Sequence, residues 1–259
     1  MLSNRSFLEH EIPYRQLEML GISKKGFMAA NRDILTTILT GGFSPLLKMQ
    51  MEANDKTYHF LAKIRLQRDP KGGVTLGILP LRYSTPKDKE LRLDDAEMEH
   101  LRKGLILKKN VYHDNKKVTY YAQLDGETNS ILKVKARDIA VPPIVKDVDI
   151  SKKQRDEIRE GLPVELDADG TTYTIGIDLL QPSGILIIKG NEDDWNELVA
   201  REWDRVHPNE IGFWLTDENG WEYMEIQDSE LQDMNIDYDI DEDISDSLEE
   251  QRRGGSIKL

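Results

Sequence analysis

The spacing of hydrophobic and polar positions along the chain switches several times between that of a helix and that of a strand. These switches mark a unit that recurs. Residues 93–104 place apolar side chains at helical spacing and end at a glycine, and residues 150–161 repeat this pattern. Each is followed by segments in which apolar and polar residues alternate, as in half-buried strands. The pattern predicts a short helix, a terminating glycine and a small antiparallel β-meander, used at least twice.

The two clear copies keep a constant spacing. Leu101 and Ile158 are 57 positions apart, as are Gly104 and Gly161, whereas Asp125 and Asp178 are 53 apart. The difference falls in the hairpin between the first two strands, where insertions are tolerated. A looser copy begins with a helix over 34–39 and continues through strands within 46–79, after shorter helices over 14–20 and 24–28. The alternative is chance recurrence, since a helix followed by a meander is a common arrangement.

The pattern changes after Gly190. Residues 195–206 have helical spacing, and two alternating segments, 211–216 and 221–226, flank a turn containing Asn219-Gly220, a strong hairpin signal. Residues 228–259 are acidic and poor in apolar mass, so we expect an acidic, disordered C-terminal tail. We therefore predict an α+β fold of repeated helix-plus-meander units, divided into residues 1–88, 89–146, 147–190, 191–227 and the tail 228–259.

Composition and charge narrow the class of protein. The 259 residues include no cysteine, no run long enough for a membrane span and no apolar leader at the start. We expect a cytoplasmic protein without a membrane partner. The net charge of −13 is uneven: residues 1–90 and 91–146 carry +5 and +3, whereas residues 191–259 carry −17. Such an asymmetry suggests different partners for the two ends, or only a solubilising tail.

No catalytic motif is present in the sequence. It has no phosphate-binding glycine loop, no nucleophile elbow and no histidine pair at metal-binding spacing. The aspartates of residues 237–243 resemble the start of a calcium loop, but Glu242 replaces the required glycine and Leu248 the final glutamate. We expect neither enzymatic activity nor a metal or other cofactor.

Basic and aromatic side chains on the predicted strands are candidates for nucleic-acid contact. Lysines and tyrosines on small sheets can hold phosphates and stack bases. Ordinary solvated strand faces have the same composition, so that alternative stays open. The candidates, all within residues 1–146, are Lys63, Arg65, Lys108, Lys109, Lys116, Lys117 and Tyr120.

Large apolar residues near the C-terminus are candidates for docking to a protein partner. Acidic–hydrophobic alternation in a disordered segment is typical of docking sequences that become ordered on binding, although a tail can also act only as a solubiliser. The candidates are Trp214, Trp221, Tyr223, Met234, Ile236, Tyr238, Ile240 and Ile244.

The repeat resembles a family known as domain of unknown function 3945. The resemblance rests on Leu101-Arg102-Lys103-Gly104 with Tyr121 and Asp125, and on Ile158-Arg159-Glu160-Gly161 with Tyr173 and Asp178. The first 85 residues resemble its usual N-terminal companion, domain of unknown function 4099, through Ile12-Pro13-Tyr14, Leu20-Gly21-Ile22 and Leu39-Thr40-Gly41-Gly42. The resemblance implies a protein of bacterial mobile elements and supplies no catalytic residues.

Two functions are consistent with these patterns. The first is a non-catalytic adaptor of a mobile genetic element, accessory to DNA processing or transfer, that binds protein or nucleic acid. The alternative is an acidic inhibitor that mimics DNA and binds a host nucleic-acid-binding or defence protein. The sequence leaves open the partner's identity, the oligomeric state and whether the units pack as one body.

Overall fold

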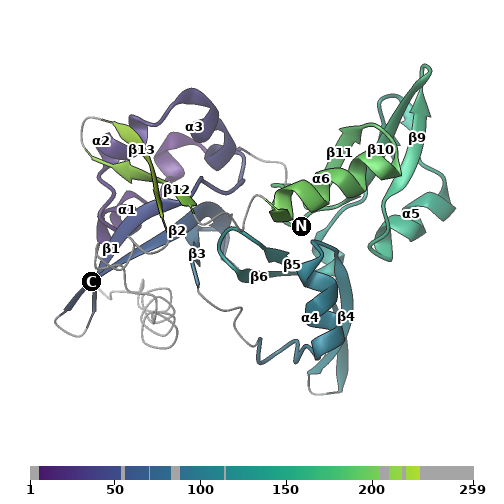
Figure 1. Ribbon diagram of the computed structural model, residues 1–259, viewed down its shortest axis with the longest axis horizontal. Coiled ribbons are helices and arrows are strands. Elements are labelled where there is room, and N and C mark those ends of the chain that lie inside the picture. Colours follow the sequence, from purple (N-terminus) through teal and green to yellow (C-terminus); the bar gives the residue numbers. More distant parts are fainter. Residues whose placement is uncertain are drawn as a thin grey trace. The chain divides into compact units, whose positions relative to one another are not determined.

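A computed structural model describes residues 6–53, 56–69, 71–82, 88–113, 115–204, 210–217 and 220–227. These residues form two compact units (Figure 1). One, which we call the sheet unit, contains residues 8–38, 44–82 and 210–227. The other, which we call the repeat unit, contains residues 88–204 with residues 6–7 and 39–43.

Short helices open the sheet unit, and local signals set their ends. The hydroxyl of Ser23 accepts a hydrogen bond from the backbone N–H of Gly26 and caps the second helix. Gly21, at φ +78°, follows the first helix and adopts the left-handed conformation that favours glycine. The helical segments are η1 (Glu9–Glu11), α1 (Tyr14–Met19), α2 (Lys24–Met28) and α3 (Arg32–Leu39).

The sheet unit contains a five-stranded sheet in the order β13-β12-β1-β2-β3. Its strands are β1 (Leu47–Ala53), β2 (Lys56–Arg68), β3 (Val74–Pro80), β12 (Glu210–Thr216) and β13 (Trp221–Gln227). The predicted meander accounts for β1 to β3. The later hairpin extends this sheet, because β12 pairs in parallel with β1 at Trp214 and Leu47 (Figure 1).

Apolar side chains of both the helices and the strands build the core of the sheet unit. Helix α1 contacts β1 and β3, and Leu17 of that helix is fully buried. Phe60 and Ile64 of β2 lie on one face of the sheet and are at most 1% exposed. On the other face, Leu46, Leu61 and Phe213 form a second buried cluster, which joins the late hairpin to the early meander.

The repeat unit contains both clear copies of the predicted helix-plus-meander unit. Copy A consists of α4 (Asp95–Arg102), β4 (Leu107–His113), β5 (Lys116–Asp125) and β6 (Ser130–Lys135). Copy B consists of α5 (Lys152–Arg159), β9 (Val164–Ala168), β10 (Thr171–Ile177) and β11 (Ile185–Lys189). Each has the three-stranded antiparallel sheet that the alternation predicted, and the α+β class is confirmed.

The recurring sequence signals have the same local roles in the two copies. Capping boxes begin both helices, at Asp94 and Ser151, and glycines with positive φ, Gly104 and Gly161, follow them. The carboxylate of Asp125 accepts the hydroxyl proton of Thr128 at 2.6 Å in the turn after β5. That of Asp178 accepts the N–H of Leu180 at 3.0 Å after β10.

The strand register refines the correspondence between the copies. Tyr120 pairs with Lys135, and Tyr173 pairs with Lys189. Tyr173 therefore corresponds to Tyr120, not to Tyr121 as the sequence comparison had it. The hydroxyl of Tyr121 instead donates to the carbonyl of Arg159 at 2.7 Å, at the end of α5 in copy B.

Copies A and B are also joined by a buried polar contact. The amide nitrogen of Gln123 donates to the carboxylate of Asp178 at 3.1 Å, and its amide oxygen accepts the N–H of Leu179 at 2.6 Å. Both Gln123 and Asp178 are less than 9% exposed. Because unpaired buried polar groups are costly, this contact fixes the two copies against each other.

Helix α6 (Glu192–Asp204) packs against both copies. A Cβ atom built on Gly176 of copy B would lie 2.8 Å from the ring of Trp195, and one on Gly104 of copy A would lie 2.6 Å from Val199. The expected boundary differs here, since residues 191–227 were grouped as one segment. The structure assigns α6 to the repeat unit and the β12–β13 hairpin to the sheet unit.

The segment between the two copies holds elements that the sequence analysis did not predict. They are η2 (Ala136–Asp138), β7 (Ile144–Val145) and β8 (Val148–Asp149). Lys146 and Asp147 form the turn between the two strands, with φ values of +49° and +63°. Two-residue strands are too short to show a period, and Lys-Asp lacks the asparagine and glycine that usually signal such a turn.

Candidate functional site

The β4–β5 hairpin brings together most of the basic candidates predicted from the sequence. Its strands pair from Leu107 opposite Ala122 to His113 opposite Lys116. Side chains of neighbouring strand residues point to opposite faces. The lysines therefore divide between an α4-facing side, with Lys109, Lys116 and Tyr120, and an outer side, with Lys108 and Lys117. Sequence reasoning listed these residues together and did not separate the faces.

On the α4-facing side, two of the candidates are engaged in the fold. The ammonium group of Lys109 pairs with the carboxylate of Glu97 on α4 and donates to the carbonyl of Arg92 at 3.1 Å. Tyr120 is 6% exposed, lies in the apolar cluster around Leu101 and donates its hydroxyl to Glu90 at 2.6 Å. These contacts give both residues a structural role in this conformation.

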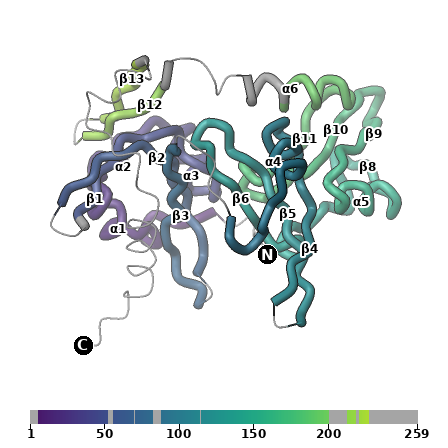
Figure 2. The backbone as a smooth tube through the Cα atoms, turned by 60° about the horizontal axis from the view of Figure 1, so that its bottom comes forward, coloured from purple at the N-terminus to yellow at the C-terminus, as the bar shows by residue number. Residues whose placement is uncertain are grey.

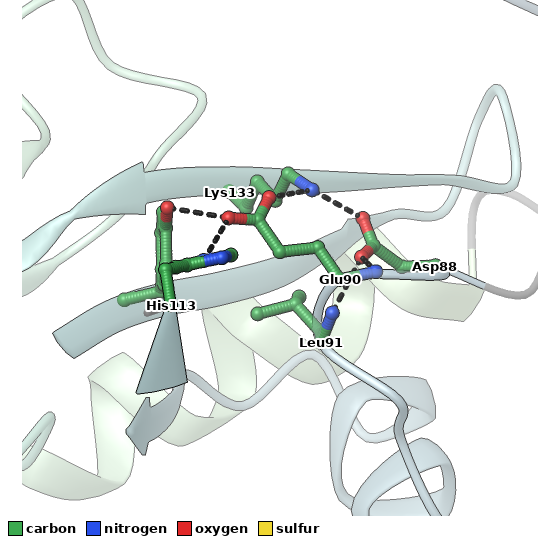
Figure 3. Close-up of polar contacts among 6 residues, drawn as sticks. Asp88, Glu90, Leu91, His113 and Lys133 are labelled. Carbon is green, nitrogen blue, oxygen red and sulfur yellow. Dashed lines mark hydrogen bonds and ion pairs between the residues drawn. The ribbon is translucent and has the colours of Figure 1, made fainter. Parts of the chain in front are cut away.

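Glu90 is the centre of a polar network on the same side (Figure 3). Its carboxylate accepts from Lys133 at 2.6 Å and contacts Nε2 of His113 at 2.8 Å, besides the bond from Tyr120. Lys133 also reaches Asp88 at 2.9 Å. The hydrogen bonds from Lys133 and Tyr120 lower the pKa of Glu90 to about 2. Burial, followed by the bond to Glu90, raises the pKa of Tyr120 to about 12.

This network anchors the segment that enters copy A. The carboxylate of Asp88 accepts the N–H groups of Glu90 and Leu91 at 2.9 Å and 2.7 Å. Figure 3 shows Asp88 and Glu90 flanking the end of Lys133. The sequence analysis named none of Asp88, Glu90 and Lys133 as candidates. Acidic and basic residues alternate over 87–90, and this local pattern gave no sign that His113 and Lys133 would converge there.

The tip of the hairpin extends past α4 and is exposed on both faces (Figure 2). Tyr112 is 70% exposed, and Lys116 and Lys117 are also exposed. Lys117 forms no ion pair with any residue in the described part of the chain. Asn115, at φ +62°, lies in the turn between the strands. The tip therefore presents two cations and an aromatic ring to solvent. The sequence analysis did not include Tyr112 among its candidates.

A groove of about 650 Å³ lies at the root of the outer face, between the hairpin and the end of α5. Its apolar lining comes from Leu105, Ile106, Leu107, Leu162 and Pro163. Its polar lining comes from His100, Lys108, Asn110, Lys117, Thr119 and Glu160. Lys108 reaches the carboxylate of Glu160 at 2.7 Å, so an ion pair between the two copies forms part of the lining.

The other two basic candidates belong to the sheet unit. Lys63 and Arg65 lie on one face of β2, opposite Leu79 and Gly77 of β3. Lys63 is 8% exposed and Arg65 is half-buried, and both already take part in interactions. They are therefore not part of the hairpin surface.

The described docking candidates form an aromatic cluster on the β12–β13 hairpin. Trp214 lies directly opposite Tyr223, with ring centroids 5.3 Å apart, and 6.4 Å from Trp221. The indole of Trp221 donates to the carbonyl of Gly26 in α2 at 2.7 Å, so this ring helps to attach the hairpin. Tyr223 is 50% exposed. The remaining candidates lie outside the described residues: Met234, Ile236, Tyr238, Ile240 and Ile244.

The described residues contain no candidate for a metal site or for a membrane-spanning helix. Within them, no three histidine, aspartate or glutamate side chains lie close enough together to hold a metal ion. No helix in this part of the chain has the length and apolar character needed to cross a membrane. The acidic segment 237–243 considered as a calcium loop lies outside these residues.

Comparison with known protein families gives a similarity that covers the first third of the chain. No curated protein and no solved structure matches the sequence. The expected resemblance of the first 85 residues is confirmed. Residues 7–90, which include α1 to α3 and β1 to β3, match the family described as protein of unknown function (DUF4099).

Proposed function

We propose that this protein is a non-catalytic adaptor that binds single-stranded nucleic acid through the tip of the β4–β5 hairpin. The observation that carries the proposal is the combination of Lys116, Lys117 and Tyr112, all exposed, on a hairpin that extends beyond its own core. Lysines attract the phosphate backbone, and an exposed tyrosine offers a surface on which bases of any sequence can stack.

The broader setting of the proposal is a bacterial mobile genetic element, in which the protein assists DNA processing or transfer. Support for this setting comes from the resemblance of the repeat described under Sequence analysis and from the DUF4099 match of residues 7–90. The charge distribution adds support, because residues 91–146, which include the hairpin, carry a net charge of +3 in a chain whose total net charge is −13.

Binding of a fluorescein-labelled single-stranded DNA of about 20 nucleotides, followed by anisotropy, tests the proposal. Replacing both tip lysines, Lys116→Gln with Lys117→Gln, should weaken binding by about fivefold or more. A matched control is Lys152→Gln with Lys153→Gln, since these lysines are also adjacent and exposed, but lie on α5. Equal weakening by the two double variants, or no binding by the unmodified chain, would contradict the proposal.

A further inference from the structure

The groove beside the hairpin combines two kinds of surface that suit an amphipathic ligand. Leu105 and Leu162 occupy equivalent positions, each directly after the glycine that ends a helix, and their side chains are 38% and 56% exposed. They provide the groove with apolar surface from both copies. Lys108 and Lys117, on the outer face of the hairpin, provide positive charge.

The two lysines can accept acidic groups without loss of a buried contact. Lys117 has no ion-pair partner among the described residues. Lys108 pairs with Glu160, but the glutamate side chain is 65% exposed, so the pair is accessible to exchange with another carboxylate. Exposed ion pairs contribute little net stability, so exchanging Glu160 for another carboxylate costs the fold little.

The spacing of the lysines suits an extended peptide. Lys117 lies opposite Tyr112, four residues along β4 from Lys108. At about 3.4 Å per residue, the two positions are separated by about 14 Å along the strand direction. Two carboxylates four residues apart in an extended peptide have the same separation, and the residues between them alternate between the two sides of the peptide.

The chain itself contains a sequence with this pattern. From residue 236 to 241 it reads Ile236-Asp237-Tyr238-Asp239-Ile240-Asp241, with apolar and acidic residues in strict alternation. In an extended conformation, Asp237 and Asp241 have the four-residue spacing, and the apolar side chains project from the opposite side. Residues 228–259 carry 11 acidic and 3 basic residues, complementary in charge to the hairpin.

We propose that the groove between copies A and B binds the acidic–apolar segment 236–241 of this chain. The aspartates pair with Lys108 and Lys117, and the apolar residues contact Leu105 and Leu162. Because Lys117 also belongs to the proposed nucleic-acid surface, the segment competes with nucleic acid there. The peptide site itself does not depend on nucleic-acid binding.

A labelled peptide of residues 231–246, added to the full chain, tests the proposal. For this experiment the full chain is made with Asp237→Asn, Asp239→Asn and Asp241→Asn. These substitutions remove the acidic groups of its own segment, so that the added peptide can occupy the groove. The peptide should bind, and adding Lys108→Gln with Lys117→Gln should weaken binding at least tenfold. Adding Leu162→Ser should also weaken it, without the folding risk of a core substitution, since Leu162 is 56% exposed. The control is Lys152→Gln with Lys153→Gln.

A second peptide with the same composition, but with its acidic and apolar residues in separate blocks, tests the alternation. It should bind at least fivefold more weakly. Equal binding of the two peptides, absence of peptide binding, or unchanged binding after the Lys108 and Lys117 substitutions would overturn the proposal. Anisotropy with the DNA probe on the same variants separates the two ideas: peptide binding without DNA binding would contradict only the proposed function.

Discussion

At the scale of single residues, the contacts of Glu90 show that basic and aromatic side chains can hold a fold together instead of forming a binding site. Its carboxylate contacts Lys133, Tyr120 and His113, which are drawn from three strands of copy A. Of these three residues, only Tyr120 was a candidate for nucleic-acid contact in the sequence analysis. In the structure they hold the entering segment of copy A in place, while Tyr112 and Lys117 lie outside this network.

The pKa of Glu90 predicts a particular dependence of stability on pH. Its folded-state pKa of about 2 lies below the ordinary value of 4.5, so its charged form stabilises the fold above pH 4.5, and this contribution disappears as the pH falls toward 2. Glu90→Gln should lower the free energy of unfolding by about 1 kcal/mol at pH 7, a value discounted for partial exposure. Urea unfolding at pH 7 and pH 3 measures it. A deficit of the same size at both pH values would contradict this role.

Tyr112 carries a prediction of its own, because its ring is 70% exposed and has little to do with folding. Tyr112→Ala should weaken binding of the single-stranded DNA probe by about 1–3 kcal/mol, whereas Tyr112→Phe should retain most of the affinity, since stacking needs the ring. Anisotropy titrations measure both, with thermal unfolding as the control for stability. If phenylalanine and alanine weaken binding equally, stacking is not the contribution of this residue.

At the scale of elements, the glycine after each repeated helix combines a local role with a packing role. Gly104 has φ +74°, and a Cβ atom added to it would lie only 2.6 Å from a side-chain carbon of Val199 on α6. Gly170, in the turn between β9 and β10, has φ +72° with no atom within 4 Å of an added Cβ. A substitution at Gly170 therefore introduces backbone strain alone, whereas a substitution at Gly104 introduces both strain and crowding.

Gly104→Ala should therefore destabilise the protein more than Gly170→Ala. In both variants the positive φ lowers the free energy of unfolding by about 1 kcal/mol. Only Gly104→Ala also displaces α6, which lowers it by about 1–2 kcal/mol more. Denaturant unfolding followed by tryptophan fluorescence measures both, since Trp195 lies on α6. Equal destabilisation would show that α6 is not held closely against copy A.

The elements also show which features could be predicted from sequence. Helices with a cap and a terminal glycine, such as 94–104 and 151–161, were predicted because their signals are local. The pairing of β1 with β12 was not, because it joins Leu47 to Trp214 across most of the chain and leaves no local pattern. For the same reason the sequence identified the lysines of the hairpin, but not that Lys109 would be paired with Glu97.

At the scale of the whole molecule, a basic hairpin belongs to a chain with a net charge of −13. An anionic ligand is then attracted by the basic hairpin and repelled by residues 191–259, which carry a net charge of −17. Specific phosphate contacts at Lys116 and Lys117 predict that added salt weakens binding, since each contact releases counterions from the nucleic acid.

The salt dependence of DNA binding tests the central claim most directly. Plots of log Kd against log salt concentration should be compared for the unmodified chain and for Lys116→Gln with Lys117→Gln. Loss of two phosphate contacts should make the slope shallower by about 1.4, at roughly 0.7 per contact for single strands. The α5 variant Lys152→Gln with Lys153→Gln should keep the original slope. Binding that does not weaken with salt, or a slope that the hairpin substitutions leave unchanged, would contradict the account.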